Sequence, residues 1–354
     1  MMPTISPITA LLAAPVCLLS ACIAKLFYKF TSAKPFDTSR QGFIKNMSSY
    51  LNRECFRDGF TSTWVLGGTV HVLCRYSSIF SGEPPIFIIP SVSKCSLDYM
   101  NFMKSIPKYR DVFCIDLAGW GISEPLANVD LCNDPLPNIF KSYAAMIYHT
   151  MTEICPIRGQ PHTLIGDAFG AYLLTHAISS GIIPTNKINK FILCEPPGLS
   201  KDTLRQPYLR GIPIKLGLLN SLTNSWLFQH VCCAFLWKRA ITLGTLLFLR
   251  HFIPDKYGYK MLSRNIRMNL MTAPYWDITI KESLMNVSRD AYNNKMKVFI
   301  VHGIRDSIVS CEHAKCVCEE SKNIKYIRVW SDHDLLSRGH HFHNLCKILQ
   351  GEDK

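Results

Sequence analysis

The sequence predicts an α/β protein with a doubly wound, mostly parallel sheet, an inserted helical cap and an N-terminal hydrophobic segment. Short apolar runs alternate with stretches of helical periodicity, which is the pattern of parallel strands joined by crossover helices. One long stretch, residues 199–290, interrupts this alternation, because it is mainly helical in period and contains no predicted strand of the same kind. The first 24 residues contain no charged side chain.

The composition is typical of a folded protein with a sizeable core. Of 354 residues, 48% are hydrophobic and 18% are charged, which excludes a disordered chain and a coiled coil. Lys and Arg outnumber Asp and Glu by 39 to 26, so the formal net charge is +13. This charge favours anionic partners such as a lipid surface or nucleic acid.

Residues 1–24 are predicted to be a membrane anchor or a signal segment. Ile5–Ala24 supplies 20 mostly apolar residues, about the length that crosses a bilayer core. The small residues of Ser20–Ala24 also suit a cleaved leader, and a buried core helix is a third interpretation. Residues 25–58 form a basic linker, and the positive-inside rule places the main domain in the cytoplasm if the segment is retained.

Residues 59–198 are expected to form the first part of the core. It begins with a β-hairpin, Thr61–Val65 and Thr69–Tyr76, around Gly67 and Gly68. Short apolar runs then predict buried strands at Pro85–Pro90, Val112–Ile115, Thr163–Ile165, Phe191–Cys194 and, in the last part of the core (residues 291–354), Val298–Val301. The intervening helices are expected at Leu97–Ile106, Ile139–Glu153, Ala171–Ile178 and His313–Glu320.

The inserted cap, residues 199–290, concentrates the positive charge. Residues 201–290 hold 13 basic and 5 acidic residues, a net of +8, together with several apolar runs. Apolar and basic residues in one segment favour a surface that lies on a membrane interface. An ordinary helical cap that packs its apolar faces on the sheet fits the same pattern.

The most specific motif is His162–Tyr172 (HTLIGDAFGAY), which reads as a strand, a turn between two glycines and a helix. It resembles the nucleophile elbow of α/β-hydrolase-fold proteins, in which a sharp turn presents one side chain above the sheet. The apex residue in this sequence is Ala168. An alanine has no oxygen to attack a carbonyl carbon, so the resemblance implies the elbow without its nucleophile.

Three further stretches are similar to the same family. Tyr109–Ser123 resembles its fourth strand and the D-x-x-G-x-G-x-S turn that follows. Val298–Val309 resembles the strand and turn that carry the acid, which implies that Asp306 is the acid. Ile327–Leu336 resembles the last strand and the histidine turn, which implies that His333 is the base, with His340 as the alternative.

The resemblance also implies an oxyanion hole, but with a changed loop. The family's His-Gly after the third strand is replaced by Pro90 and Ser91. The backbone N–H groups of Val92 and Phe169 are the predicted oxyanion donors, because a backbone group survives a change of side chain.

Other residues near the predicted site are alternative candidates for its roles. Asp167 precedes the apex by one residue, so its side chain should turn away from the substrate face. Ser91, Ser93 and Cys95 lie near the predicted mouth and are alternative nucleophiles, although each fits an ordinary loop residue. Glu195 ends the sixth strand and is a second candidate acid. His340, His341 and His343 lack the partners of a metal site, so no metal is predicted.

These residues predict a membrane-associated α/β-hydrolase-fold protein that lacks serine hydrolase activity and binds a ligand or another protein. The alternative is an active hydrolase of lipid-like esters with a non-standard nucleophile or an activated water. In the first case Asp306 and His333 are a relic, hydrogen-bonded pair, and in the second they are a working acid and base. The sequence contains no cofactor motif and no nucleic-acid recognition module, so we expect neither partner, but a lipid surface and an apolar ligand.

Removal of residues 1–24 is expected to release the protein from membranes, because this segment supplies the predicted anchor. Fractionation of cells that express the full chain or the truncated chain measures the effect. A mature protein whose N-terminus lies near Lys25 contradicts the anchor and indicates a cleaved leader in the secretory pathway.

Overall fold

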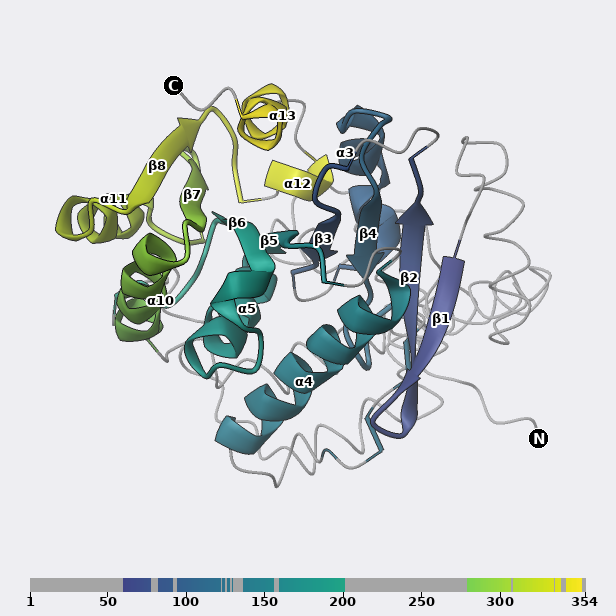
Figure 1. Cartoon of the computed structure of the whole chain (residues 1–354). Helices are drawn as coiled ribbons and strands as arrows, with labels where there is room; N and C mark the ends of the chain where they lie inside the picture. The colour runs from purple at the N-terminus through teal and green to yellow at the C-terminus, as the bar shows by residue number, and fades with distance from the viewer. Residues whose placement is uncertain are drawn as a thin grey trace, which may run out of the picture. The chain divides into compact units, whose positions relative to one another are not determined.

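An eight-stranded sheet organises the part of the chain that the computed structural model describes (Figure 1). Its strands, in the order of the chain, are β1 Phe60–Val65, β2 Gly68–Arg75, β3 Ile86–Ile89, β4 Val112–Ile115, β5 His162–Asp167, β6 Ile188–Cys194, β7 Lys297–Gly303 and β8 Ile324–Val329. Across the sheet the order is β1-β2-β4-β3-β5-β6-β7-β8, and all pairs are parallel except β1 with β2 and β2 with β4. The predicted doubly wound, mostly parallel sheet is confirmed.

The structure describes only part of the chain, so several predicted features stay untested. The described residues all lie within one of the chain's two compact units, residues 48–354, and are 60–77, 82–91, 94–121, 123–124, 126–127, 129, 136–155, 159–200, 279–306, 308–333, 335–338 and 342–351. The predicted anchor, the basic linker, residues 201–278 of the cap, Val92, Ser93 and His340 lie outside them. Within the described part, no helix has both the length and the apolar character that a bilayer crossing requires.

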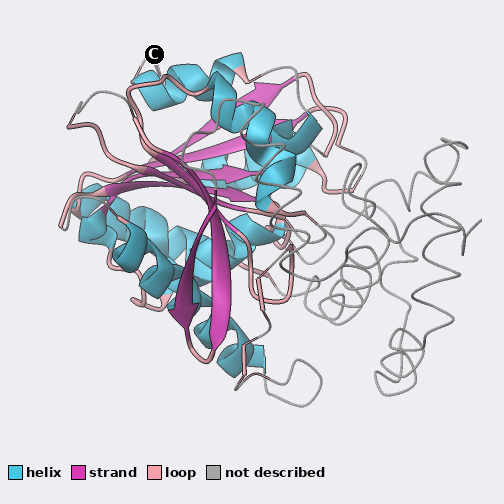
Figure 2. Ribbon diagram, turned by 90° about the vertical axis from the view of Figure 1, so that its right-hand side faces the viewer, coloured by secondary structure: helices cyan, strands magenta, loops and turns pink. Residues whose placement is uncertain are grey.

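Helices cover both faces of the sheet (Figure 2). One layer contains α4 Leu136–Ile154, α5 Phe169–Ser179, α10 Lys281–Asn293 and α11 Cys311–Glu320. The other contains α3 Met100–Ser105, α12 Leu335–Arg338 and α13 His343–Gln350, and two 3₁₀ turns, η1 Ser96–Tyr99 and η2 Thr185–Lys187, complete the described elements. The central strands are buried along their whole length, which explains why they read as continuous apolar runs.

Several element boundaries differ from the sequence prediction. The hairpin turn lies at Leu66 and Gly67, both with positive φ (48° and 79°), while Gly68 already pairs with Val65. Two successive residues with positive φ suit the type I′ turn that matches the twist of paired strands. The predicted cap boundary at residue 290 falls inside α10, whose Leu284, Val287 and Ala291 are buried in the core.

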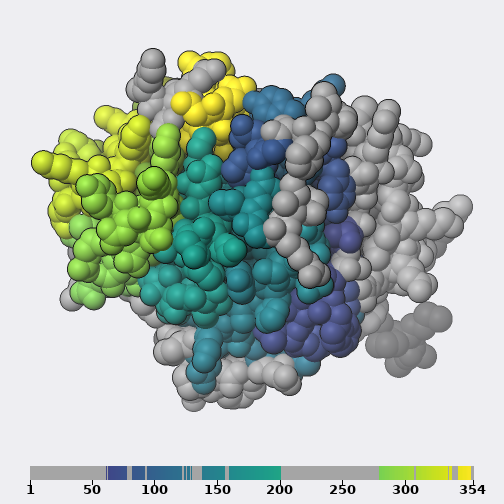
Figure 3. Space-filling model, viewed as in Figure 1, coloured from purple at the N-terminus to yellow at the C-terminus, as the bar shows by residue number. Residues whose placement is uncertain are grey.

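Buried cations hold the C-terminal helix against the sheet. The Lys190 Nζ donates to the carbonyl oxygens of Ile348 (2.6 Å) and Leu349 (3.1 Å) at the end of α13. Arg110 also donates to Leu349 O at 3.2 Å. Positive charge at a helix C-terminus satisfies free carbonyls and stabilises the helix dipole. In the space-filling view the yellow C-terminal segment accordingly lies beside the blue residues that include α3 (Figure 3).

The buried His162 makes stability dependent on pH. Its ring packs edge-on against Phe87, its Nδ1 has no hydrogen-bond partner among the described residues, and burial with nearby Lys187 lowers its pKa to about 4. Below pH 6.5 the unfolded chain takes up this proton before the folded chain does, so stability falls as the pH drops towards 4. We expect a loss of about 2 kcal/mol from this group at pH 5 relative to pH 7.5.

The variant His162→Phe should lack this contribution. Urea unfolding of the parent and the variant at both pH values measures the difference, and His149→Phe, a change at an exposed histidine of α4, is the control. Equal pH dependence in the parent and in His162→Phe contradicts the assignment.

Candidate active site

Ala168 occupies a strained turn between β5 and α5. Its φ of 44° and ψ of −104° are unusual for a residue other than glycine, and the residue is 4% exposed. Its N–H donates to Cys194 O at 2.8 Å, which joins the turn to the end of β6. Ala168 is the N-cap residue of α5, and its methyl side chain cannot accept a hydrogen bond from the first N–H groups of the helix.

Glycines on both sides allow this turn. A Cβ at Gly166 would overlap the main chain of Ala171, and a Cβ at Gly170 would overlap the carbonyl of Ile89. The elbow therefore requires the small residues that the sequence motif contains, because β5, α5 and the end of β3 approach one another through main-chain atoms.

Asp306 is a buried carboxylate in the turn after β7, and four donors surround it. Its Oδ1 accepts from the N–H groups of Ile308 and Val309, both at 2.8 Å. Its Oδ2 lies 2.8 Å from His333 Nδ1 and 3.1 Å from His302 Nε2. Burial alone would raise the pKa of Asp306, but His333 and the hydrogen bonds from both histidines lower it, so the group is ionised.

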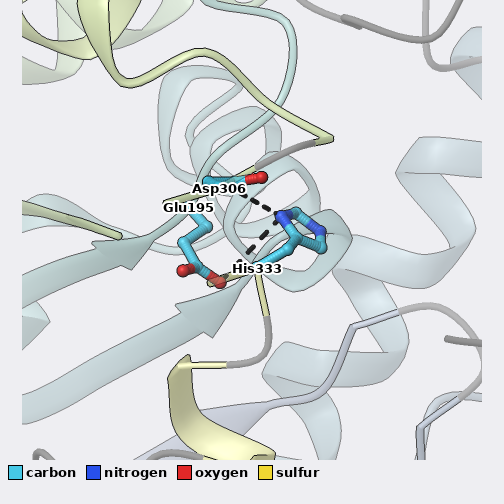
Figure 4. A group of neighbouring side chains, drawn as sticks. All are labelled: Glu195, Asp306 and His333. Atoms are coloured by element: carbon cyan, nitrogen blue, oxygen red, sulfur yellow. Dashed lines mark hydrogen bonds and ion pairs between the residues drawn. The ribbon is translucent and has the colours of Figure 1, made fainter. Parts of the chain in front are cut away.

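His333 lies between β8 and α12, and its side chain is 13% exposed. Because ionised Asp306 only accepts hydrogen bonds, the proton of a neutral His333 ring is on Nδ1. The lone pair is then on Nε2, on the side of the ring that faces away from both carboxylates in Figure 4. The structure thus brings the predicted acid and base together, although their catalytic roles stay a prediction.

Glu195 is a second buried carboxylate beside the same imidazole (Figure 4). It follows β6 with a φ of 51°, and its Oε2 lies 4.0 Å from His333 Nδ1 and accepts from Leu335 N at 3.4 Å. The lack of a side chain at Gly303 leaves room for the Glu195 carboxyl group, because a Cβ at Gly303 would lie 2.9 Å from Glu195 Oε1. Glu195 therefore holds the segment that carries His333.

His302 on β7 belongs to this cluster but was not predicted. It is fully buried, and its Nε2 lies 3.1 Å from Asp306 Oδ2 and 3.3 Å from Val309 O. Two acceptors at one nitrogen place the ring proton on Nε2. Its position four residues before Asp306, at the end of a buried apolar run, is the signal in the sequence that could have indicated it.

Asp167 is held by Tyr99, a second residue that sequence reasoning missed. Tyr99 is fully buried, donates its hydroxyl proton to Asp167 Oδ2 at 2.6 Å and accepts from Ser91 N at 2.8 Å. Burial and the carboxylate of Asp167 raise the pKa of Tyr99 well above its usual value, so the hydroxyl keeps its proton. This bond ties Asp167 to the loop after β3 and does not favour a nucleophile role.

The turn that resembles the family's D-x-x-G-x-G-x-S sequence is a hydrogen-bonded support. Asp116 Oδ1 accepts from Ser96 N at 2.6 Å, and Ser123 Oγ donates to Asp116 O at 2.8 Å. A Cβ at Gly121, which has a φ of 53°, would overlap the Asp116 carboxylate. The motif residues thus fix η1 against the end of β4.

The remaining candidates receive less support. Cys95 is buried, and burial with the neighbouring Asp98 and Asp116 raises the pKa of its thiol well above the usual value. Such a thiol is a poor nucleophile. Donor atoms of Glu195, Asp306 and His333 lie within 4.8 Å of one another, a spacing that could hold a metal ion. The hydrogen bond between His333 and Asp306 accounts for this closeness without one.

Comparisons with known proteins identify the fold. No protein-family model matches the sequence, and no curated protein matches it at a significant level. A hydrolase from Pseudomonas aeruginosa PA01 aligns with a TM-score of 0.57 at 10% identity, over 83% of this chain and 99% of its own. A serine-to-alanine variant of N-formylmaleamic acid deformylase from Pseudomonas putida S16 aligns with a TM-score of 0.55 at 15% identity, over 81% and 99%.

A third structure covers more of this chain. A membrane phospholipase A, described as a bacterial virulence factor, aligns over 97% of this chain and 98% of its own, with a TM-score of 0.51 and 12% identity. At such identities the likeness concerns the fold alone. The chain has the α/β-hydrolase fold, as the sequence motifs predicted.

We expect Tyr99→Phe to lower the free energy of unfolding by about 2 kcal/mol, because it removes a buried hydrogen bond to a carboxylate. A double-mutant cycle with Asp167→Asn should give a coupling of about 1 kcal/mol or more in denaturant titrations. Tyr326→Phe, which removes a hydroxyl that donates to Cys311 O from a half-buried position, is the control. Additive effects of the two changes contradict the bond.

Proposed function

We propose that this chain is a membrane-associated α/β-hydrolase-fold protein that binds an apolar or lipid-like carbonyl ligand and lacks serine hydrolase activity. Ala168 carries the proposal. It stands at the strained turn between β5 and α5, where the resemblance to the family places the nucleophile. A methyl group cannot form the covalent acyl intermediate of a serine mechanism.

The rest of the site still suits a carbonyl ligand. Asp306 and His333 remain in contact at 2.8 Å, and α5 begins directly after Ala168 with the N–H of Phe169. Backbone N–H groups at a helix N-terminus attract a carbonyl oxygen or another centre of partial negative charge. These features support binding and orientation of a carbonyl group, which need no nucleophile.

Two features of the sequence support membrane association. The uncharged residues 1–24 supply the predicted anchor, with the main domain in the cytoplasm, and the predicted cap joins apolar runs to a net charge of +8. A membrane phospholipase A is among the structures with this fold. A ligand that partitions into lipid would be available to a protein held at the membrane surface.

A second candidate function is hydrolysis of lipid-like esters by a water molecule that His333 activates. The ordered contact between His333 and ionised Asp306 favours it, because this pair can accept a proton from water.

Restoring the missing oxygen tests the proposal. We expect the parent to be inactive on p-nitrophenyl esters of two to twelve carbons. Ala168→Ser should gain activity of at least about 100-fold over the parent, because His333 already contacts Asp306 and the new hydroxyl would stand directly before α5. Mass spectrometry after treatment with a fluorophosphonate should find one adduct on Ala168→Ser and none at this position in the parent.

The combined variant Ala168→Ser, His333→Ala tests whether the histidine activates the new serine. It should lose the esterase activity that Ala168→Ser alone gains. Ester hydrolysis by the parent that disappears in His333→Ala contradicts the proposal and supports the water mechanism.

A further inference from the structure

We infer that the site transfers protons at carbon, exchanging the acidic C–H beside the carbonyl group of a neutral ketone or ester through His333. This inference rests on the proposed function, because it requires that the site bind a carbonyl ligand. Loss of the nucleophile removes acyl transfer, but proton abstraction requires a base and a place for negative charge, and neither depends on residue 168.

The hydrogen bonds fix which nitrogen can act as the base. Asp306 Oδ2 lies 2.8 Å from His333 Nδ1 and so holds the ring proton on that nitrogen. Nε2 then carries the lone pair, on the side of the ring away from the carboxylates (Figure 4). In a serine hydrolase the equivalent nitrogen acts on the serine hydroxyl. Ala168 has no hydroxyl to offer, so the base acts on the ligand itself.

Asp306 stabilises the base once it has taken the proton. When Nε2 takes a proton, the positive imidazolium contacts ionised Asp306 at 2.8 Å, and Glu195 Oε2 lies 4.0 Å from the same ring nitrogen. Opposite charge at 2.8 Å stabilises the imidazolium, and burial strengthens the effect because little water screens it. The imidazolium can therefore hold the proton until it exchanges with solvent and a hydron returns to carbon.

The N-terminus of α5 provides the place for negative charge. As the C–H bond breaks, its electron pair moves into the C–C bond and the carbonyl electrons move onto oxygen, giving an enolate. The N–H of Phe169 opens an 11-residue helix, whose dipole stabilises an anion at that end. Return of a hydron from the imidazolium, after exchange with solvent, restores the carbonyl compound, so no other reactant is needed.

The same charges select the ligand. While His333 is neutral, ionised Asp306 leaves a negative charge beside the base. An anionic acid would be repelled there, whereas a neutral ketone or ester would not. The ligand class is therefore neutral carbonyl compounds with an acidic C–H, even though the chain as a whole is strongly basic.

Deuterium exchange tests the inference. The full chain is incubated in D₂O with phenylacetone or 2-octanone, and proton NMR follows loss of the signal from the carbon beside the carbonyl. We expect exchange well above the buffer rate and a loss of about 100-fold in its protein-dependent part in His333→Gln, the usual contribution of a general base. Asp306→Asn should also lower the rate, and His343→Gln, at an exposed histidine of α13, should leave it unchanged.

Saturation-transfer NMR on the same samples reports binding of each ketone. Binding without exchange that depends on His333 overturns the inference and leaves the proposed function standing. Absence of binding by both ketones, with sodium octanoate bound instead, overturns the inference and the ligand class of the proposed function together.

Discussion

The contact between the start of α5 and the end of β3 is the constraint on which the site depends. Gly170 lies so close to the carbonyl of Ile89 that a single methyl group would overlap it, and a methyl group at Gly166 would overlap the main chain of Ala171. These contacts force the chain into a sharp turn and place Ala168 at its apex with positive φ. The turn is therefore maintained by main-chain packing, and the chemistry of the apex side chain does not contribute to it. A scaffold of this kind can lose its nucleophile and keep its shape.

Polar groups around the turn are supported from two sides. Tyr99 connects the loop after β3 to Asp167, immediately before the apex. On the other side, His302 and two backbone N–H groups satisfy Asp306 independently of His333. A buried carboxylate with several donors is stable without a catalytic partner. The acid and the base are thus parts of a satisfied network as well as candidates for chemistry.

The sequence predicted the sheet and the sharp turn at Ala168 because both leave local signals, whereas the acid and base were implied only by the resemblance to a known family. Apolar runs such as Val112–Ile115 mark buried strands, and the glycines around Ala168 mark the elbow. The hairpin turn was displaced by one residue, since Leu66 adopts a conformation that composition does not favour at this position. Tyr99 was missed because it is identified by its partner, and Asp167 is 68 positions away in the chain. A long-range hydrogen bond of this kind has no periodicity to detect. His302 lies only four residues before Asp306, but a histidine that ends an apolar run has no pattern of its own that marks a site.

The cations beneath α13 connect this helix to the centre of the sheet. Lys190 lies in β6 and Arg110 precedes β4, yet the carbonyl oxygens they contact belong to Ile348 and Leu349, at least 158 positions later in the chain. Arg110 also contacts Glu83 and Pro84 O, whereas α13 supplies two acceptors to the buried Lys190 ammonium group. Loss of these acceptors would be costly, because a buried charge requires hydrogen-bond partners. The helix at this end of the domain is therefore part of the electrostatic balance of a central strand, and a change in α13 would be felt in β6.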